Sequence, residues 1–157
     1  MNLMLAIIGG DPARFAPYVE LYKKASEQAG RTPGDIGVHS PGYIAESDEQ
    51  ARRDLFPHFK KIRDRLGKER GWPPVTERDF EHEIAHGSLY AGSPQTVADK
   101  IAKTVQTLGI SRFQMKYSAG PMEHEKLMRS IELYGSRVIP RVRDNLSSLL
   151  ANSQNKR

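Results

Sequence analysis

The sequence contains no cysteine, and this absence excludes two classes of protein at once. A fold cross-linked by disulfides and an enzyme with a thiol nucleophile both need cysteine. Long apolar runs are missing as well, and the apolar stretch within residues 1–10 is too short to span a membrane. That stretch also lacks the preceding basic residues of a signal peptide. We therefore expect a cytoplasmic protein without a membrane partner.

A strong excess of one charge is missing too. The 24 basic and 19 acidic residues leave a net charge of +5, and the densest region, residues 48–70, mixes both signs. Mixed charges at this density are typical of a solvated helix face. No basic groove lined with aromatic residues and no known nucleic-acid motif accompanies them. The sequence therefore does not indicate a nucleic-acid partner.

The length of the chain limits the folds that it can form. With 157 residues, 38% of them hydrophobic and 27% charged, the chain has the size and composition of one soluble globular domain. A complete (β/α)8 barrel typically needs about 250 residues, so this chain is too short to hold one.

Residues 92–120 have the pattern of a complete unit of loop, helix, turn and strand. Ser93 is a good N-cap residue, Pro94 suits the first helical position, and Gly109 suits a left-handed helix end. The apolar residues that recur at helical spacing are Val97, Ala98, Ile101, Ala102, Val105 and Leu108. Residues 110–117 then alternate apolar and polar, which predicts a strand with one apolar face.

Near the start, residues 3–8 form a continuous apolar run, which predicts a strand buried on both faces in a parallel sheet. Gly9 and Gly10 end the run, and Asp11 followed by Pro12 suits the start of a helix. Bare backbone amides beside the positive end of a helix favour an anion at this turn. The alternative is structural, because any turn from strand to helix favours small residues and a cap.

A short strand at residues 36–39 is expected next, and Ser47 or Asp48 should open a long polar helix. Proline lacks the amide hydrogen that a helix interior needs. We therefore expect Pro57 to kink or break this helix between residues 55 and 58.

The chain should end in helical structure. Apolar spacing beyond residue 121 predicts one long helix or two abutting helices, with a break at Pro140. Residues 151–157 are polar, and we expect them to form a frayed tail.

Residues 82–86 match the HExxH motif, in which two histidines one helical turn apart bind zinc and the glutamate activates water. The helix that holds them is expected to be short, and a third ligand at the longer spacing of this motif is absent, because Leu89 and Gly92 occupy those positions. Solvent-exposed helix residues are the alternative. A zinc hydrolase using His82 and His86 therefore remains a minor hypothesis, and we predict no metal site.

Four sequence segments together resemble the bacterial luciferase-like flavin monooxygenases. In chain order they are MLAIIGGDPARFAPYVELYKKA, GYIAESDEQAR, GSPQTVADKI with the following LGI and RFQM, and SIELYGSRVIPRVR. The resemblance implies a (β/α)8 TIM barrel with a reduced flavin, FMN or the deazaflavin F420, at the carboxyl ends of its strands. Given the length, we expect an α/β fold that is a partial barrel. Residues 1–150 would supply about the last three βα repeats and a long C-terminal helix, followed by the tail.

The same resemblance implies a cofactor site at the first turn. The loop at this place in the family helps to hold the flavin phosphate, which assigns backbone contacts to Gly9, Gly10 and Asp11. Arg14 would be a charge partner for the phosphate, one turn further on. No catalytic residue can be assigned, because the residues with which family members position flavin and substrate lie largely in the amino-terminal half.

Four further residues are candidates for the barrel interior or the substrate pocket. His39 is the polar residue of its strand, and Tyr43 belongs to a segment that lines the route to the flavin in the family. Gln114 and Lys116 lie on the polar side of the last strand, which in a barrel would face inward. The alternatives are a hydrogen-bonded structural histidine and an edge strand with a wet face.

Two main functions follow. The first is a flavin-dependent monooxygenase domain, in which reduced flavin and O2 act on a small organic substrate and a separate reductase supplies the flavin. The second is a non-catalytic half-barrel that serves as an assembly module. An open parallel sheet leaves its edges and one face uncovered, so in either case we expect a homo-oligomer.

Overall fold

The computed structural model describes residues 2–117 and 121–154, with side-chain surroundings up to residue 148. It has an α/β fold built on one parallel sheet, as the sequence predicts. The strands are β1 (Leu3–Ala6), β2 (Ile36–Ile44), β3 (Tyr90–Gly92) and β4 (Arg112–Lys116). The helical elements are η1 (Pro12–Phe15), α1 (Ala16–Gln28), α2 (Asp48–Arg70), α3 (Glu77–Ala85), α4 (Pro94–Leu108), α5 (His124–Leu133), η2 (Tyr134–Val138) and α6 (Ile139–Gln154).

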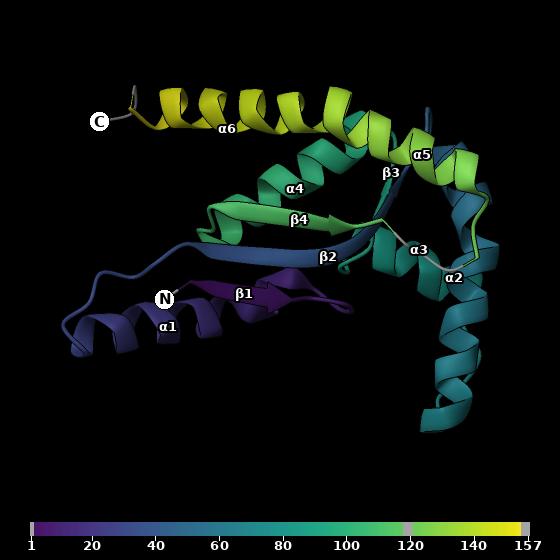
Figure 1. The fold of residues 1–157 in the computed structure, drawn as a ribbon, viewed down its shortest axis with the longest axis horizontal. Helices are drawn as coiled ribbons and strands as arrows, with labels where there is room; N and C mark the ends of the chain where they lie inside the picture. Colours follow the sequence, from purple (N-terminus) through teal and green to yellow (C-terminus); the bar gives the residue numbers. More distant parts are fainter. Residues whose placement is uncertain (1, 118–120, 155–157) are drawn as a thin grey trace.

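Strand β2 is the centre of the sheet and pairs in parallel with all three other strands. Residues 36–39 of β2 pair with β1, residues 37–41 pair with β4, and residues 42–44 pair with the short β3. The arrowheads of β1, β2 and β4 point toward the side of the molecule where α2 and α3 lie (Figure 1). The carboxyl ends of the strands, where α/β folds usually bind ligands, therefore lie on that side.

Helix α4 begins and ends where the sequence predicts. The Ser93 hydroxyl accepts a hydrogen bond from the Thr96 amide at 3.3 Å, Pro94 is the first helical residue, and Gly109 ends the helix with φ at +60°. Strand β4 alternates as predicted, with Phe113 and Met115 packed against buried core residues. These signals are local to the chain, which explains why the sequence alone determines them.

Strand β1 differs from its prediction, because only one of its faces is covered. Ile7 is completely buried, whereas Met4 is 43% exposed and Ile8 is 71% exposed. The helices that cover β1 pack on the face that carries Ile7 and Val38, and Met4 and Ile8 on the other face stay exposed. An unbroken apolar run therefore did not guarantee burial on both sides.

Helix α2 is also different from expectation, because it runs through Pro57 without a break. Packing on both sides of the proline explains this. Leu55 is fully buried before Pro57, and after it Phe59 packs on the Phe80 ring with the ring centroids 5.2 Å apart. Gly71, with φ at +70°, then ends the helix.

The C-terminal helical segment runs without a gap over residues 124–154, with a wide turn next to Pro140 in place of the expected break. Helix α5 passes into η2, a turn of π-helix, in which the Ile139 amide reaches back to the Tyr134 carbonyl. Proline cannot donate an amide hydrogen, and the wide turn precedes it directly. Helix α6 then continues to Gln154, so the predicted tail is helical over 151–154, and residues 155–157 lie outside the described residues.

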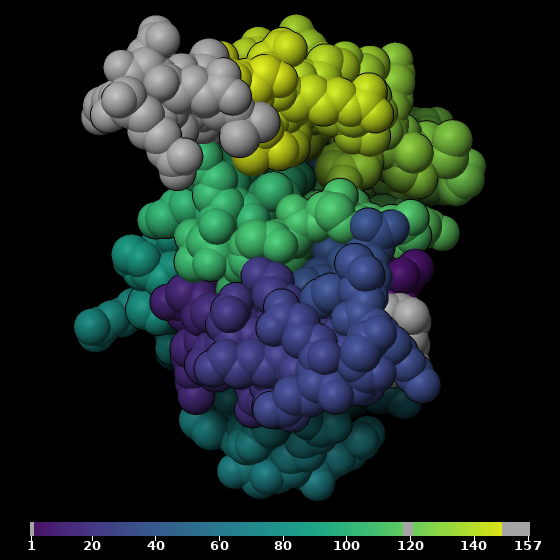
Figure 2. Space-filling view, turned by 90° about the vertical axis from the view of Figure 1, so that its left-hand side faces the viewer, coloured from purple at the N-terminus to yellow at the C-terminus, as the bar shows by residue number. Residues whose placement is uncertain are grey.

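Helix α6 packs on α4, above the sheet (Figure 1). A view from the amino ends of the strands shows the same layers, with the yellow C-terminal helix over the green segment and the purple and blue N-terminal part below (Figure 2). In the described part of the chain, no helix combines the length and apolar character that crossing a membrane requires.

Candidate functional site

Polar side chains of two strands lie side by side on the uncovered face of the sheet. His39 of β2 is aligned with Ala6 of β1 and with Gln114 of β4, and Lys116 of β4 is aligned with Pro41. Residues on one face of a strand alternate, so Met4, His39 and Gln114 point to the same side. The two candidates Gln114 and Lys116 are exposed there, and His39 is half-buried.

Gly37 shapes the amino end of this face. A Cβ atom at Gly37 would lie 2.7 Å from Met4 Cε and 3.3 Å from Arg112 Cβ, so these two side chains close over the glycine from either side. A hollow of about 480 Å³ lies at β4, and His39, Gln114 and Lys116 line it together with Phe113, Met115 and Tyr134, which pack toward the covered face. The structure thus brings three of the four interior candidates to one surface.

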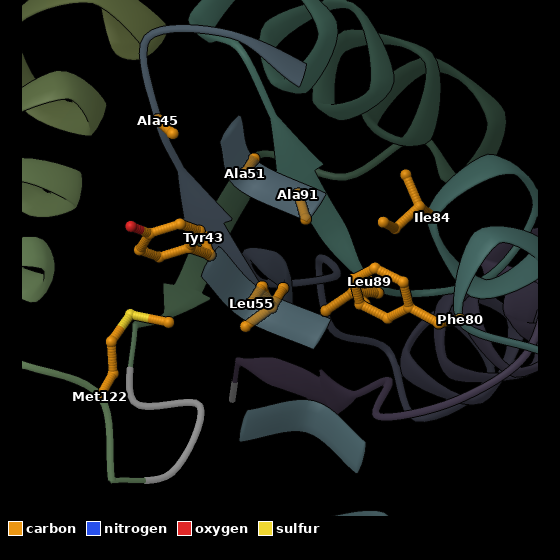
Figure 3. Packing of buried hydrophobic residues seen from close by; sticks show 9 residues of the cluster. All are labelled: Tyr43, Ala45, Ala51, Leu55, Phe80, Ile84, Leu89, Ala91 and Met122. Carbon is orange, nitrogen blue, oxygen red and sulfur yellow. The ribbon is translucent and has the colours of Figure 1, made fainter. Parts of the chain in front are cut away.

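Tyr43, the fourth candidate, lies elsewhere. It is 2% exposed and packs with Leu55, Phe80 and Leu89 in a core cluster between β2, α2 and α3 (Figure 3). Its hydroxyl donates to Asp54 Oδ2 at 3.4 Å. Burial, together with the neighbouring Asp54 carboxylate, raises the pKa of Tyr43 to about 12. Tyr43 therefore packs in the core beneath the carboxyl end of β2 and does not line the hollow.

The loop after β1 holds an oxyanion that belongs to the protein itself. Gly10 has φ at +75°, and its amide donates to Glu83 Oε1 of α3 at 3.2 Å. The Asp11 carboxylate accepts from the Ala13 amide at 2.8 Å and so caps η1. Arg14 makes no ion pair with any described residue. The cofactor candidates Gly9, Gly10, Asp11 and Arg14 are thus close together, and the Glu83 carboxylate accepts a hydrogen bond from the Gly10 amide.

The HExxH residues of α3 make contacts of a different kind from a zinc site. The rings of His82 and His86 lie 5.1 Å apart between centroids, and Glu83 is bound to Gly10. Among residues 2–117 and 121–154, no group of three or more histidine, cysteine, aspartate or glutamate side chains is placed to hold a metal. The geometry gives no support to the zinc hydrolase.

Lys100, which the sequence pattern did not single out, fixes the end of α3. Its ammonium group donates to the carbonyl oxygens of Glu83, Ile84 and Leu89 at 3.3, 2.6 and 2.8 Å. Two of these carbonyls belong to the last turn of α3 and the third to the segment before β3, so the ammonium group ties the helix end to that segment. Burial lowers the pKa of Lys100 to about 8. By holding the end of α3, Lys100 holds Glu83 against the Gly10 loop.

Asp48 joins the first turns of α2 and α4. Its carboxylate accepts from the Ser93 amide at 2.6 Å and from the Thr96 hydroxyl at 2.9 Å. Gly92 has φ at +151°, and a Cβ atom there would lie 2.6 Å from Asp48 Oδ1. These hydrogen bonds join the ESD segment to the GSP segment, which lies 45 residues later in the sequence. They fix the position of the first turn of α2 relative to α4.

Solved structures of similar fold include monooxygenases and a coenzyme F420 dependent reductase. The monooxygenase RslO1 from Streptomyces bottropensis aligns with a TM-score of 0.71 at 21% identity, over 87% of this chain and 40% of that one. The oxygenating constituent of 3,6-diketocamphane monooxygenase from Pseudomonas putida, solved with FMN, aligns with a TM-score of 0.63 at 23% identity, over 87% and 42%. The coenzyme F420 dependent tetrahydromethanopterin reductase from Methanopyrus kandleri aligns with a TM-score of 0.54 at 20% identity, over 88% of this chain and 45% of that one.

These likenesses concern the fold, and the chain spans less than half the length of each of these three structures. No curated protein matches the chain significantly. The model of one protein family, the luciferase-like monooxygenases, matches residues 2–112, which is most of the chain. The chain therefore belongs to the luciferase-like monooxygenase family.

Proposed function

We propose that this chain is the carboxyl-terminal part of a flavin-dependent monooxygenase, with β1, β2 and β4 as the last three strands of a (β/α)8 barrel. The observation that carries the proposal is the hydrogen bond from the Gly10 amide to Glu83. It places an oxyanion at the carboxyl end of β1, on the face of the barrel at which this fold class binds its ligands. The incomplete coverage of the matched structures supports the assignment to part of a barrel.

The loop fits a flavin phosphate on one condition. The amide of Gly10 is already turned toward an oxyanion, and Arg14 offers a positive charge without a described ion-pair partner. A phosphate at Gly10 must therefore displace the Glu83 carboxylate, because two anions repel each other at this distance. In this proposal Gly9, Gly10 and Asp11 contribute backbone amides, and Arg14 contributes charge.

FMN is the proposed cofactor, and F420 is the alternative. The Pseudomonas putida protein was solved in complex with FMN, and the Methanopyrus kandleri protein depends on F420. Reduced flavin would supply two electrons to O2, so that one oxygen atom enters a small organic substrate and the other leaves as water. A separate reductase would provide the reduced flavin.

The side chains of this chain would orient the substrate. His39 and Gln114 lie next to each other on the uncovered face and offer hydrogen-bond donors and acceptors. The imidazole of His39 would hold a proton beside the substrate or release it, at whichever ring nitrogen faces the hollow. Lys116 would add a positive charge nearer the carboxyl end of β4.

A comparison of FMN with riboflavin tests this function, because riboflavin lacks the phosphate. Purified protein is titrated with each compound, oxidised and reduced, and flavin fluorescence or absorbance is followed. We expect FMN to bind at least tenfold more tightly, since a charge-assisted phosphate site contributes about 1.5–3 kcal/mol. Equal affinities for the two compounds would contradict a phosphate site at the Gly10 loop.

The uncovered sheet face favours a second candidate function, that of an assembly module. Exposed Met4 and Ile8 lie on it, and β1 and β4 each pair on only one side among the described residues. We propose that two copies pair through this face and form a homodimer in solution. Light scattering should then give about twice the chain mass of 17.7 kDa. A single species at the monomer mass would contradict it.

A further inference from the structure

A second cavity lies away from the sheet, between α2, the following loop and α3. It has a volume of about 320 Å³, within the range of small-molecule sites. Its walls are Phe59 and Arg63 of α2, Trp72 to Val75 of the loop, and Asp79, His82 and Glu83 of α3. The proposed flavin function uses none of the aromatic and basic groups of this cavity.

Arg63 is the unusual residue in this cavity. It is half-buried, and its guanidinium carbon lies 5.4 Å from the centre of the Trp72 ring and 6.0 Å from that of Phe59. Its Nε atom is buried without a hydrogen-bond partner, and Arg63 forms no ion pair with any described residue. A buried donor without a partner costs about 1–3 kcal/mol. Two aromatic contacts alone do not account for a cation in this position.

The loop that carries Trp72 is held in place by the protein. Lys60 donates to the Val75 carbonyl at 2.8 Å, and the Val75 amide donates to Asp64 at 2.7 Å. The Trp72 amide donates to the Gly67 carbonyl at 2.9 Å. Trp72 nevertheless remains 43% exposed. The loop therefore fixes Trp72 before any ligand arrives, with the guanidinium groups of Arg63 and Arg70 over its ring.

The acidic groups of the cavity are engaged elsewhere. Asp79 Oδ2 accepts from the amide and the hydroxyl of Thr76, which closes the capping box of α3. Glu83 Oε1 accepts from the Gly10 amide. Neither carboxylate pairs with Arg63, so the positive charge of Arg63 is left for a ligand.

We propose that this cavity binds a small planar organic anion, with its acidic group on Arg63 and its ring packed against the exposed part of Trp72. Arginine recognises carboxylates through paired hydrogen bonds and stacks on aromatic faces, so one ligand of this shape satisfies both features. Pro73 and Pro74 form the rest of the apolar wall. The site lies outside the flavin loop, and its occupation does not require a flavin.

Benzoate is a suitable probe, and Trp72 is the reporter, because it is the only tryptophan of the chain. The emission of Trp72, excited at its long-wavelength edge, is followed as benzoate is added to the flavin-free protein. We expect a saturable change with benzoate. Benzyl alcohol keeps the ring without the charge, and acetate keeps the charge without the ring, so each should bind at least tenfold more weakly.

Arg63→Met should weaken benzoate binding at least tenfold, and Arg63→Lys, which keeps the charge and loses the planar fork, at least threefold. Arg70→Met is the matched control. Arg70 also lies over the Trp72 ring, at 5.0 Å, but does not line the cavity, so its loss should change affinity less than twofold. Far-UV circular dichroism checks the fold of each variant. No saturation, equal binding of acetate, or unchanged affinity in Arg63→Lys would overturn the proposal.

Discussion

Replacing Asp48 with alanine should lower the free energy of unfolding by about 3 kcal/mol. The carboxylate of Asp48 receives the Ser93 amide and the Thr96 hydroxyl, and hydrogen bonds to a charged group contribute about 1.5–3 kcal/mol each. The variant leaves both donors at the start of α4 without their acceptor. For a domain of this size the loss corresponds to a fall in melting temperature of very roughly 6–12 °C. Thermal or urea unfolding followed by circular dichroism measures it.

Glu49→Ala is the matched control for this prediction. Glu49 is the next residue in the first turn of α2 and is exposed, so its replacement removes a similar helix-end charge without the contacts to α4. We expect a loss below about 1 kcal/mol for it. Equal losses for the two variants would show that Asp48 acts only through the helix end.

The pH dependence of stability gives a further check on Asp48. Burial pushes the pKa of Asp48 upward, but the hydrogen bonds from Ser93 and Thr96 outweigh it, and the net shift is downward. A carboxylate with a lowered pKa stabilises the fold above its unfolded pKa of about 4, and the contribution disappears as pH falls through the folded value. The stability difference between wild type and Asp48→Ala should therefore be full at pH 7 and shrink in acid.

The parts of the fold that the sequence predicted are those with local causes. The cap at Ser93, the left-handed end at Gly109 and the alternation of β4 each depend on a few neighbouring residues. The burial of β1 was wrong because it depends on what covers the far face of the sheet. The break at Pro57 was wrong because tertiary packing on both sides of the proline outweighs one missing hydrogen bond.

The candidate site shows the same limit. The turn at Gly10 suggested an anion, but its partner Glu83 lies 73 residues away and belonged to a motif that we associated with zinc. Lys100 and Arg63 carry no sequence signal of their own, because their roles depend on carbonyls and rings brought together by folding. The sequence favoured Tyr43 as a residue that lines the barrel interior. Strand β2 continues past Pro41 and places Tyr43 in a buried core cluster.

Two substitutions at the flavin loop should change FMN affinity in opposite directions. Glu83→Gln removes the charge that competes with phosphate at Gly10, and we expect affinity to rise about fivefold, which is the difference between a charged and a neutral acceptor. Gly10→Val places a branched side chain at φ +75°, which strains the loop by about 1–3 kcal/mol and should lower affinity at least about fivefold. The two variants should therefore differ at least about twenty-five-fold.

The most direct test of the account is this pair of FMN titrations, made beside wild type and Glu81→Gln. Glu81 is a nearby acid of α3 that pairs with Arg52 at 2.9 Å, so its loss controls for the general effect of removing a charge. We expect tighter binding in Glu83→Gln, weaker binding in Gly10→Val and wild-type binding in Glu81→Gln. Unchanged affinity in both loop variants, or no saturable FMN binding by any of the four proteins, would contradict it.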